Sequence, residues 1–266
     1  MKPPPFDYHV PATVDEAVAL RTADSDAVVL AGGQSLVPLL NMRLARPSAL
    51  IDLRCVGGLS YVRAGEGGVA VGAMTRQREL ERSAEAFEAC PILREALELV
   101  GHPPIRNRGT VGGSIAHADP AAELPAVLCV LGGRVGATGP RGTREIAADD
   151  FFLYPFTTSL EPDEVLTEVF FPKAPSGSGY AALELTRRHG DFALAGVCAV
   201  VSNGSARLCF TGVGGRPVLV DSDEPDAWQA AIDPSADATG SADYRRQLVA
   251  VLGRRALELA RARSAQ

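Results

Sequence analysis

Two short segments that each contain a Gly-Gly pair most constrain what this chain can fold into. The first is Gly32-Gly33-Gln34-Ser35, which directly follows the apolar run 27–31, and the second is Gly109-Thr110-Val111-Gly112-Gly113-Ser114. Glycine lacks a Cβ, so its backbone can take a positive φ and a ligand can approach it closely. Successive amides in such a turn can point the same way and bind an anion. Although either segment alone is more often a plain tight turn, the pair predicts a diphosphate-binding site.

The spacing of the glycines excludes two common nucleotide-binding motifs. The chain has no Gly-x-x-x-x-Gly-Lys-Ser/Thr segment, which an ATP-hydrolysing P-loop requires. It also has no Gly-x-Gly-x-x-Gly segment opening a long helix, as a Rossmann fold would have. Neither Ser35 nor Ser114 lies in the Gly-x-Ser-x-Gly turn of a hydrolase. We therefore predict no catalytic residue, and His117 with Asp119 lacks a third ligand at a credible spacing for a metal site.

The first 55 residues are predicted to form a small α/β unit. Thr13-Val14-Asp15-Glu16 reads as a capping box for a short helix, and the run 27–31 predicts a buried strand. A helix is expected from about Leu36 and a further strand at 49–53. Glycine turns between strand and helix are typical of such units.

The rest of the chain is predicted to form a second subdomain, a linker and a smaller last domain. In the second subdomain we expect a hairpin around 65–72, a helix from a Thr75 cap to about Glu88, an amphipathic helix at 91–100, a helix opened by Asp119-Pro120 that carries Glu123, and an aromatic core cluster at 151–156. A linker is expected at 173–179. In the last domain we expect a hairpin turn at Asn203-Gly204, a loop-like acidic stretch at 221–243, and a final helix at about 244–262 with a solvated arginine face. The predicted boundaries are 1–175, divided at about residue 55, and 176–266.

Composition limits the classes of partner. The formal net charge is −6, and no basic block is dense enough to follow a phosphate backbone, so nucleic acid is not expected as a partner. No apolar run approaches the roughly 20 residues of a transmembrane helix, and we see no signal peptide, so a cytoplasmic location is expected. The five cysteines are widely separated and are expected to be buried reduced thiols rather than metal ligands.

Longer motifs around both glycine segments resemble a known family. Ala31-Gly32-Gly33-Gln34-Ser35-Leu36, followed by the segment from Thr110 to Glu123, resembles the FAD-binding medium subunit of molybdenum hydroxylases such as carbon monoxide and xanthine dehydrogenases. The opening Phe6-Asp7-Tyr8 and the later Arg187-Arg188-His189-Gly190-Asp191 are similar as well. The resemblance implies an α+β FAD-binding fold of the vanillyl-alcohol-oxidase (PCMH) type in two subdomains, followed by a smaller α+β domain with a three-stranded sheet.

The resemblance also implies which residues bind FAD. It places the diphosphate on amides of the two glycine segments, His117 near the flavin or its ribityl chain, Glu123 on ribose or ribityl hydroxyls, Leu166 near the adenine, and Asp191 beside the isoalloxazine. The cofactor-binding residues predicted in this way are Ala31, Gly32, Gly33, Gln34, Ser35, Leu36, Thr110, Val111, Gly112, Gly113, Ser114, His117, Glu123, Leu166 and Asp191.

The function implied by the resemblance is electron transfer within a larger complex. A large subunit with the molybdenum cofactor would oxidise a substrate, a small 2Fe-2S subunit would relay single electrons, and FAD on this chain would pass them to NAD, a quinone or oxygen. The identities of the substrate and of the acceptor are not predicted. A free-standing FAD-dependent oxidase or reductase of the same fold, and a scaffold that has lost its flavin, remain as alternatives.

Overall fold

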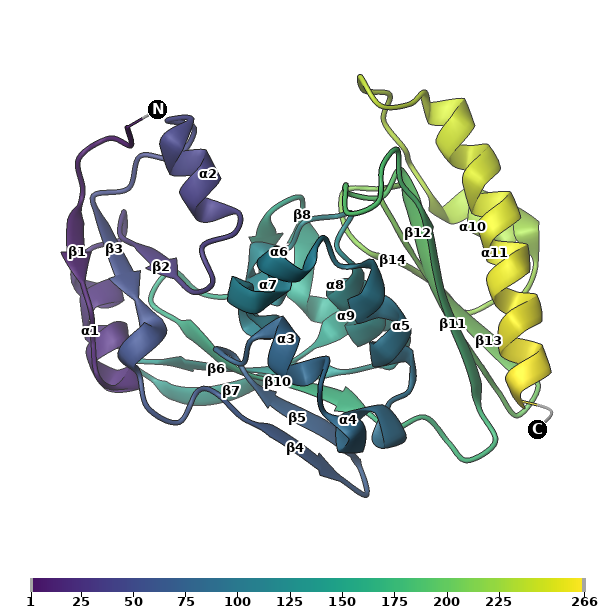
Figure 1. The fold of residues 1–266 in the computed structure, drawn as a ribbon, viewed down its shortest axis with the longest axis horizontal. Helices are drawn as coiled ribbons and strands as arrows, with labels where there is room; N and C mark the ends of the chain where they lie inside the picture. Colours follow the sequence, from purple (N-terminus) through teal and green to yellow (C-terminus); the bar gives the residue numbers. More distant parts are fainter. Residues whose placement is uncertain (1, 265–266) are drawn as a thin grey trace.

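The computed structural model describes residues 2–264, which form an α+β fold with three main sheets. A small parallel sheet lies at one end of the molecule, and a C-terminal sheet with the last helix lies at the other (Figure 1). A five-stranded sheet and its helices lie between them. Each end contributes one hydrophobic cluster, and the largest cluster fills the middle.

The N-terminal end is the predicted α/β unit. Its parallel strands run in the order β1-β3-β2. Thr13 caps the first helix by accepting a hydrogen bond from the amide of Glu16. The elements are β1 (Asp7–His9), α1 (Val14–Ala23), β2 (Val28–Leu30), α2 (Leu36–Asn41), β3 (Ala49–Asp52) and a 3-10 turn at Leu53–Cys55.

One expectation for this unit is wrong, because strand β2 is not buried. Val28 is exposed, and Val29 and Leu30 are half-buried. β2 is an edge strand of its sheet, and Val28 and Val29 line the cavity described below. The uninterrupted apolar run therefore forms a strand that lines a pocket and is not buried in the core.

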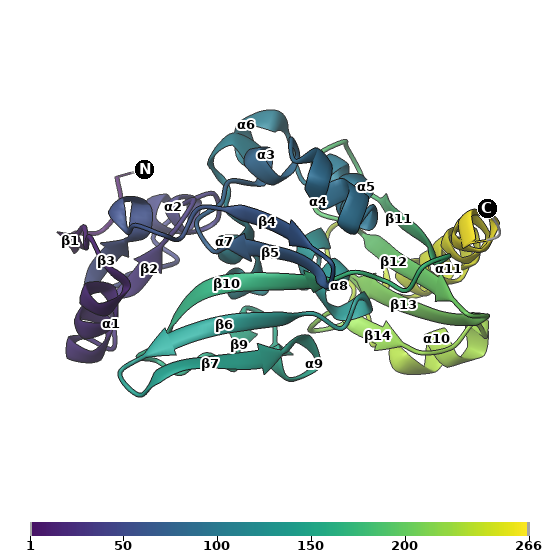
Figure 2. The ribbon, with the colours of Figure 1, turned by 90° about the horizontal axis from the view of Figure 1, so that it is seen from below.

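The middle of the molecule is an antiparallel five-stranded sheet with the strand order β4-β5-β10-β6-β7, as Figure 2 shows. Helices α5, α7 and α8 lie above this sheet in Figure 1 and share its core. The elements are β4 (Val62–Gly65), β5 (Gly68–Gly72), α3 (Gln77–Leu80), α4 (Ala84–Ala89), α5 (Ile92–Leu99), α6 (Pro103–Arg108), α7 (Val111–His117), α8 (Glu123–Val130), β6 (Arg134–Gly139), β7 (Gly142–Ala147), α9 (Ala148–Phe151), β8 (Phe152–Tyr154), β9 (Thr157–Thr158) and β10 (Val165–Pro172).

The single helix predicted from Thr75 to about Glu88 is two helices, α3 and α4. The Thr75 hydroxyl does not cap a helix, because it accepts from the amide of Tyr61 and donates to the carbonyl of Tyr61. Ser83 interrupts the helical run by capping α4 through the amide of Ala86. Serine competes with helical backbone bonds in this way and favours a helix start over a helix interior.

The C-terminal sheet has four antiparallel strands instead of the three that were expected. The extra strand, β14, pairs with β13 at the edge of the sheet. Helix α11 packs on one face of the sheet, and α5 and α8 contact the opposite side. The elements are β11 (Gly179–Leu185), β12 (Ala195–Ser202), β13 (Ser205–Thr211), β14 (Val218–Val220), α10 (Pro225–Ala231) and α11 (Ala242–Ser264).

Two further expectations for the last domain are wrong. The acidic stretch expected to be a loop contains helix α10, whose Trp228 is completely buried and donates its indole N–H to the carbonyl of Ser222. Trp228 packs against Gly253 of α11, and Gln229 donates to the carbonyl of Arg246, so both residues hold α10 on α11. The arginine face of α11 is also not wholly solvated, because Arg245 is buried.

The cysteine expectation holds for four of the five residues. Cys90, Cys129, Cys198 and Cys209 are buried free thiols, but Cys55 is exposed because it lies in the turn after β3. Within residues 2–264 no group of three metal-binding side chains is placed to hold an ion. No helix in that range combines the length and apolar character that crossing a membrane would require.

Candidate functional site

A cavity of about 610 Å³ lies between the N-terminal unit and the helices of the middle sheet. Its volume is within the range of about 300–1,000 Å³ that is usual for small-molecule and cofactor sites. Most of the surface that lines it is apolar. The predicted site residues that line it are Ala31, Gly32, Gly33, Gln34, Ser35, Leu36, Thr110, Gly112, Gly113, Ser114, His117, Glu123 and Leu166.

The two glycine segments meet at this cavity. A Cβ added to Gly32 would lie 2.5 Å from the carbonyl oxygen of Arg108 and 2.7 Å from Cα of Gly109. A Cβ added to Gly113 would lie 3.3 Å from Cβ of Ala31. Gly33 has a φ of +74°, which favours glycine. The sequence-based prediction that folding joins the two segments is therefore confirmed.

The first glycine segment presents free amides to the cavity. Among residues 2–264, no hydrogen bond uses the backbone N–H groups of the five residues from Gly32 to Leu36. The first helical bond of α2 is donated by Val37, to the carbonyl of Gly33 at 3.1 Å. Unpaired amides at the entry to a helix are a natural site for an anion.

The second glycine segment works differently from the expectation. It is the first turn of helix α7, with Thr110 as the N-cap, and its amides already donate inside the protein. Val111 donates to the carbonyl of Thr75, Gly112 to that of Ala73, and Gly113 and Ser114 to the hydroxyl and carbonyl of Thr110. The amides from Thr110 to Ser114 were expected to cradle an anion, but those from Val111 to Ser114 are used inside the protein and do not form that cradle.

The glycines of the second segment instead permit close packing. A Cβ added to Gly112 would lie 2.6 Å from Cα of Ala73, so α7 can approach the end of β5 only at a glycine. Ser114 remains on the cavity side and offers its hydroxyl. The second segment thus supplies shape and one polar side chain, while the first supplies the amides.

The turn between α7 and α8 places His117 and Glu123 on the cavity. Ala118 ends α7 in a left-handed conformation, with a φ of 51°. Asp119 accepts from the amide of Ala121 within the turn, so it does not cap α8 as expected, and Glu123 is the first residue of that helix. Burial lowers the pKa of His117, with Asp119 opposing the change, which favours the neutral imidazole.

Glu123 is half-buried, and its carboxyl has an unusual proton affinity. Burial raises the pKa of Glu123 to about 8, and the neighbouring carboxylates of Glu184 and Asp119 add to the rise. Burial also raises the pKa of Glu184 to about 7. At neutral pH the Glu123 carboxyl is therefore mostly protonated, and it can donate a hydrogen bond as well as accept one.

Leu166 and Phe156 border the cavity from the side of β10. Leu166 lies where β10 shifts register against β6, and such a bulge redirects side chains. Phe156 was expected to lie in a core cluster, but its side chain is 59% exposed and only Phe151 and Phe152 are buried. The backbone of Phe156 is left-handed, its amide donates to the carbonyl of Ala118, and its ring lies 5.1 Å from that of His117.

Two predicted site residues do not line the cavity. The side chain of Val111 is fully buried in the core below α7. Asp191 lies outside the cavity and pairs with Arg188 at 3.7 Å, while the next residue, Phe192, lines the cavity and is 63% exposed.

Several cavity residues were not predicted from the sequence. They include Arg21, Gln77, Phe156 and Phe192, together with residues 160–162, 164 and 165. The one local signal that could have indicated Phe192 is an aromatic residue directly after the Gly190-Asp191 pair. The others reach the cavity only through tertiary contacts.

A family model described as the FAD binding domain in molybdopterin dehydrogenase matches residues 4–174. The chain belongs to this family of FAD-binding domains. The match includes both glycine segments and every residue from Thr110 to Leu166 that lines the cavity. The family match therefore identifies FAD as the cofactor of this chain, and the cavity is the candidate site for it.

Named relatives of this flavoprotein chain match over nearly its whole length. The 6-hydroxypseudooxynicotine dehydrogenase complex subunit alpha of Paenarthrobacter nicotinovorans is 41% identical, covering 97% of this chain and 95% of the relative. The carbon monoxide dehydrogenase medium chain of Afipia carboxidovorans is 40% identical, covering 99% of both chains. A chain in the carbon monoxide dehydrogenase structure from Hydrogenophaga pseudoflava superposes with a TM-score of 0.95 at 37% identity, covering 99% of each chain. These relatives are subunits of oxidoreductases.

The raised pKa of Glu123 predicts a specific pH dependence of stability. The unfolded carboxyl releases its proton near its ordinary pKa of 4.5, whereas the folded carboxyl holds it up to about pH 8. The free energy of unfolding of the cofactor-free chain should therefore fall as pH rises from 4.5 to 8. We expect this fall to exceed that of Glu123→Gln by up to about 5 kcal/mol.

Urea unfolding at a series of pH values measures this difference. Glu88→Gln is the matched control, because Glu88 is exposed, and its curve should follow that of the wild type. Equal pH slopes for Glu123→Gln and the wild type would contradict the assignment of a protonated carboxyl.

Proposed function

We propose that this chain is the electron-transfer subunit of a molybdenum hydroxylase complex, in which FAD on this chain accepts electrons from an iron–sulfur subunit. NAD, a quinone or oxygen would then take them. The observation that carries the proposal is the first glycine segment, whose five free amides face a cofactor-sized cavity against the second segment. The names of the relatives support a role as one subunit of a larger oxidoreductase.

The residues on the cavity fit the chemical parts of FAD. The amides from Gly32 to Leu36 would hold the diphosphate, with the hydroxyls of Ser35 and Ser114 beside it. The protonated carboxyl of Glu123 would bond a ribityl or ribose hydroxyl, and a neutral His117 could do the same from α7. Leu166 would pack on the adenine. Apolar walls would surround the ring systems.

The redox chemistry belongs to the bound flavin, which can exchange electrons singly or in pairs. The protein orients it and leaves one end accessible. Phe192 and Phe156 are the exposed aromatic residues on the cavity, and we propose that they border the isoalloxazine end, where electrons enter and leave. Phe192 takes the place beside the ring that was expected for Asp191.

The partners that we propose are a large subunit with the molybdenum cofactor and a small 2Fe-2S subunit. Substrate oxidation would occur on the large subunit, so this chain needs no acid–base pair for a substrate. We further propose that residues 1–175 form the FAD-binding domain and that residues 176–266 form a C-terminal domain whose loop at 186–193 borders the cavity through Phe192.

Purification of the chain with its co-expressed gene neighbours tests the proposal. We expect a yellow-brown complex that contains one FAD per copy of this chain, with molybdenum and iron in the co-eluting subunits. The chain purified alone should be yellow but should not have its flavin reduced by substrates of the complex.

Two outcomes would overturn this assignment. If the chain alone reduced its flavin with a small substrate, it would be a free-standing oxidase or reductase. If native preparations released no flavin on denaturation and bound none on reconstitution, it would be a scaffold without a cofactor.

A further inference from the structure

One wall of the cavity is an irregular segment between β9 and the start of β10. Leu160, Glu161, Pro162, Glu164 and Val165 of this segment line the cavity and lead directly to Leu166. Such a segment has few backbone ladder bonds of its own, so another interaction must hold its shape.

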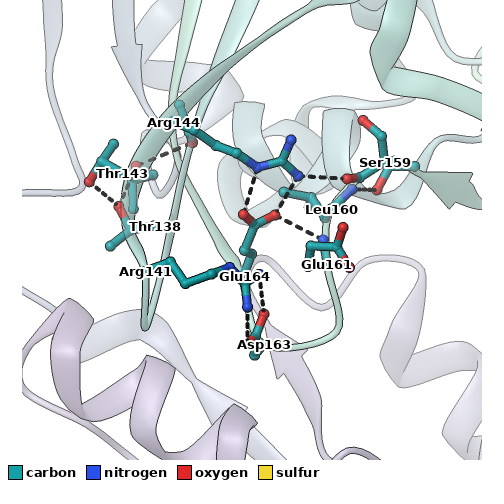
Figure 3. Close-up of polar contacts among 12 residues, drawn as sticks. Thr138, Arg141, Thr143, Arg144, Ser159, Leu160, Glu161, Asp163 and Glu164 are labelled. Atoms are coloured by element: carbon teal, nitrogen blue, oxygen red, sulfur yellow. Dashed lines mark hydrogen bonds and ion pairs between the residues drawn. The ribbon is translucent and has the colours of Figure 1, made fainter.

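The side chain of Arg144 supplies that interaction. It reaches from β7 and donates to both carboxylate oxygens of Glu164, from Nε at 2.7 Å and from Nη2 at 2.8 Å (Figure 3). The same Nη2 donates to the carbonyl of Ser159 at 2.9 Å. The Glu164 carboxylate also accepts from the amide of Glu161 at 2.8 Å. One ion pair thus ties both ends of the segment 159–164 together.

The carboxylate of this ion pair is built into the fold, whereas the Arg144 side chain is 44% exposed. The Glu164 side chain is 5% exposed. A Cβ added to Gly139 would lie 2.9 Å from Cγ of Glu164, so a glycine at this position makes room for the carboxylate. Its hydrogen bond to Arg144 lowers the pKa of Glu164, so the pair stays charged at neutral pH. A bidentate arginine–carboxylate pair also fixes orientation as well as distance.

The wall held by this pair leads into a buried part of the cavity lining. Val165 and Leu166 are buried, whereas Phe192, which also lines the cavity, is 63% exposed. Because the redox-active ring must stay accessible to electron donors, the buried wall suits the adenosine half of FAD.

We propose that Arg144 is a positioning residue which, through Glu164, fixes the wall that binds the adenosine half and so sets the selectivity for FAD over FMN. This inference rests on the proposed function. FMN lacks the adenosine, so its affinity should not depend on the wall, whereas the affinities of FAD and ADP both should.

The test compares the affinities of the full, flavin-depleted chain for three probes: FAD, FMN and ADP. Flavin fluorescence reports FAD and FMN directly, and displacement of FAD reports ADP. Arg144→Met should raise the dissociation constants of FAD and ADP about tenfold, equivalent to about 1.4 kcal/mol, and should leave that of FMN unchanged. Arg144→Lys, which keeps the charge, should partly restore both.

Matched variants separate positioning from general damage. Arg141→Met removes the exposed neighbouring pair with Asp163, which is seen beside the first pair in Figure 3, and should change none of the three affinities. Phe192→Ala, at the exposed residue that we propose borders the isoalloxazine, should weaken the binding of FAD and FMN but not of ADP. If Arg144→Met unfolds, the double variant Arg144→Met/Glu164→Met leaves no unpaired buried charge and should show the same loss of selectivity.

The outcomes distinguish this inference from the proposed function. If the wild type binds no FAD, the proposed function fails. If it binds FAD but ADP does not displace it, or if Arg144→Met weakens FAD and FMN equally, the positioning role of Arg144 is overturned while the flavin assignment stands.

Discussion

Replacing Gly32 with alanine is expected to leave the chain without detectable bound FAD. The added Cβ would lie 2.5 Å from a carbonyl oxygen and 2.7 Å from a Cα atom, both in the backbone of the second segment. Backbone cannot rotate away as a side chain can, so the two segments must separate and the five amides must shift. We expect the dissociation constant for FAD to rise at least about 100-fold, or about 2.7 kcal/mol.

The measurement is the flavin content after purification together with fluorescence titration of the cofactor-free chain. Gly57→Ala is the control, because a Cβ at Gly57 meets no atom within 4 Å. That variant should bind FAD like the wild type. Full flavin content in Gly32→Ala would show that contact between the two segments does not determine binding.

Replacing Arg245 with methionine is expected to lower the free energy of unfolding by about 3 kcal/mol, because buried acceptors lose a charged donor. One guanidinium nitrogen of Arg245 donates to the carbonyls of Leu194, at 2.5 Å, and Gly212, at 2.9 Å. The other donates to Asp237 and Thr239. These partners come from three separate loops, so the effect should spread beyond helix α11.

The loops joined by Arg245 include the one that reaches the cavity. Leu194 lies two residues after Phe192, and the amide of Gly212 donates to the carbonyl of Pro120 in the turn before Glu123. We therefore expect faster FAD release in Arg245→Met as well as the lower unfolding midpoint in urea. Arg255→Met, on an exposed face of the same helix, should change neither quantity by more than about 0.5 kcal/mol. A wild-type midpoint in Arg245→Met would rule out this anchoring role.

The sequence predicted most elements that begin or end at a local capping or turn residue. The Thr13 cap, the hairpin at 65–72 and the Asn203-Gly204 turn were all found as expected, since their conformations depend on a few adjacent residues. The prediction failed where a distant partner decided the outcome. Thr75 bonds Tyr61 instead of capping a helix, and Trp228 orders a helix by packing on Gly253.

The candidate site shows the same division. The sequence by itself determined which family of flavin-binding chains this one belongs to, and it indicated the two glycine segments and the turn with His117 and Glu123 as parts of the site. These inferences depend only on residue type and spacing. Only the tertiary structure decided that the first segment keeps all five of its amides free, since those from Val111 to Ser114 in the second segment bond to Thr75, Ala73 and Thr110. Tertiary structure also decided that Phe192 rather than Asp191 reaches the cavity, and that Arg144 bonds to the segment 159–164 that lines it. Hydrogen-bond partners and burial arise from contacts between segments far apart in the chain, and no local pattern of residues encodes them.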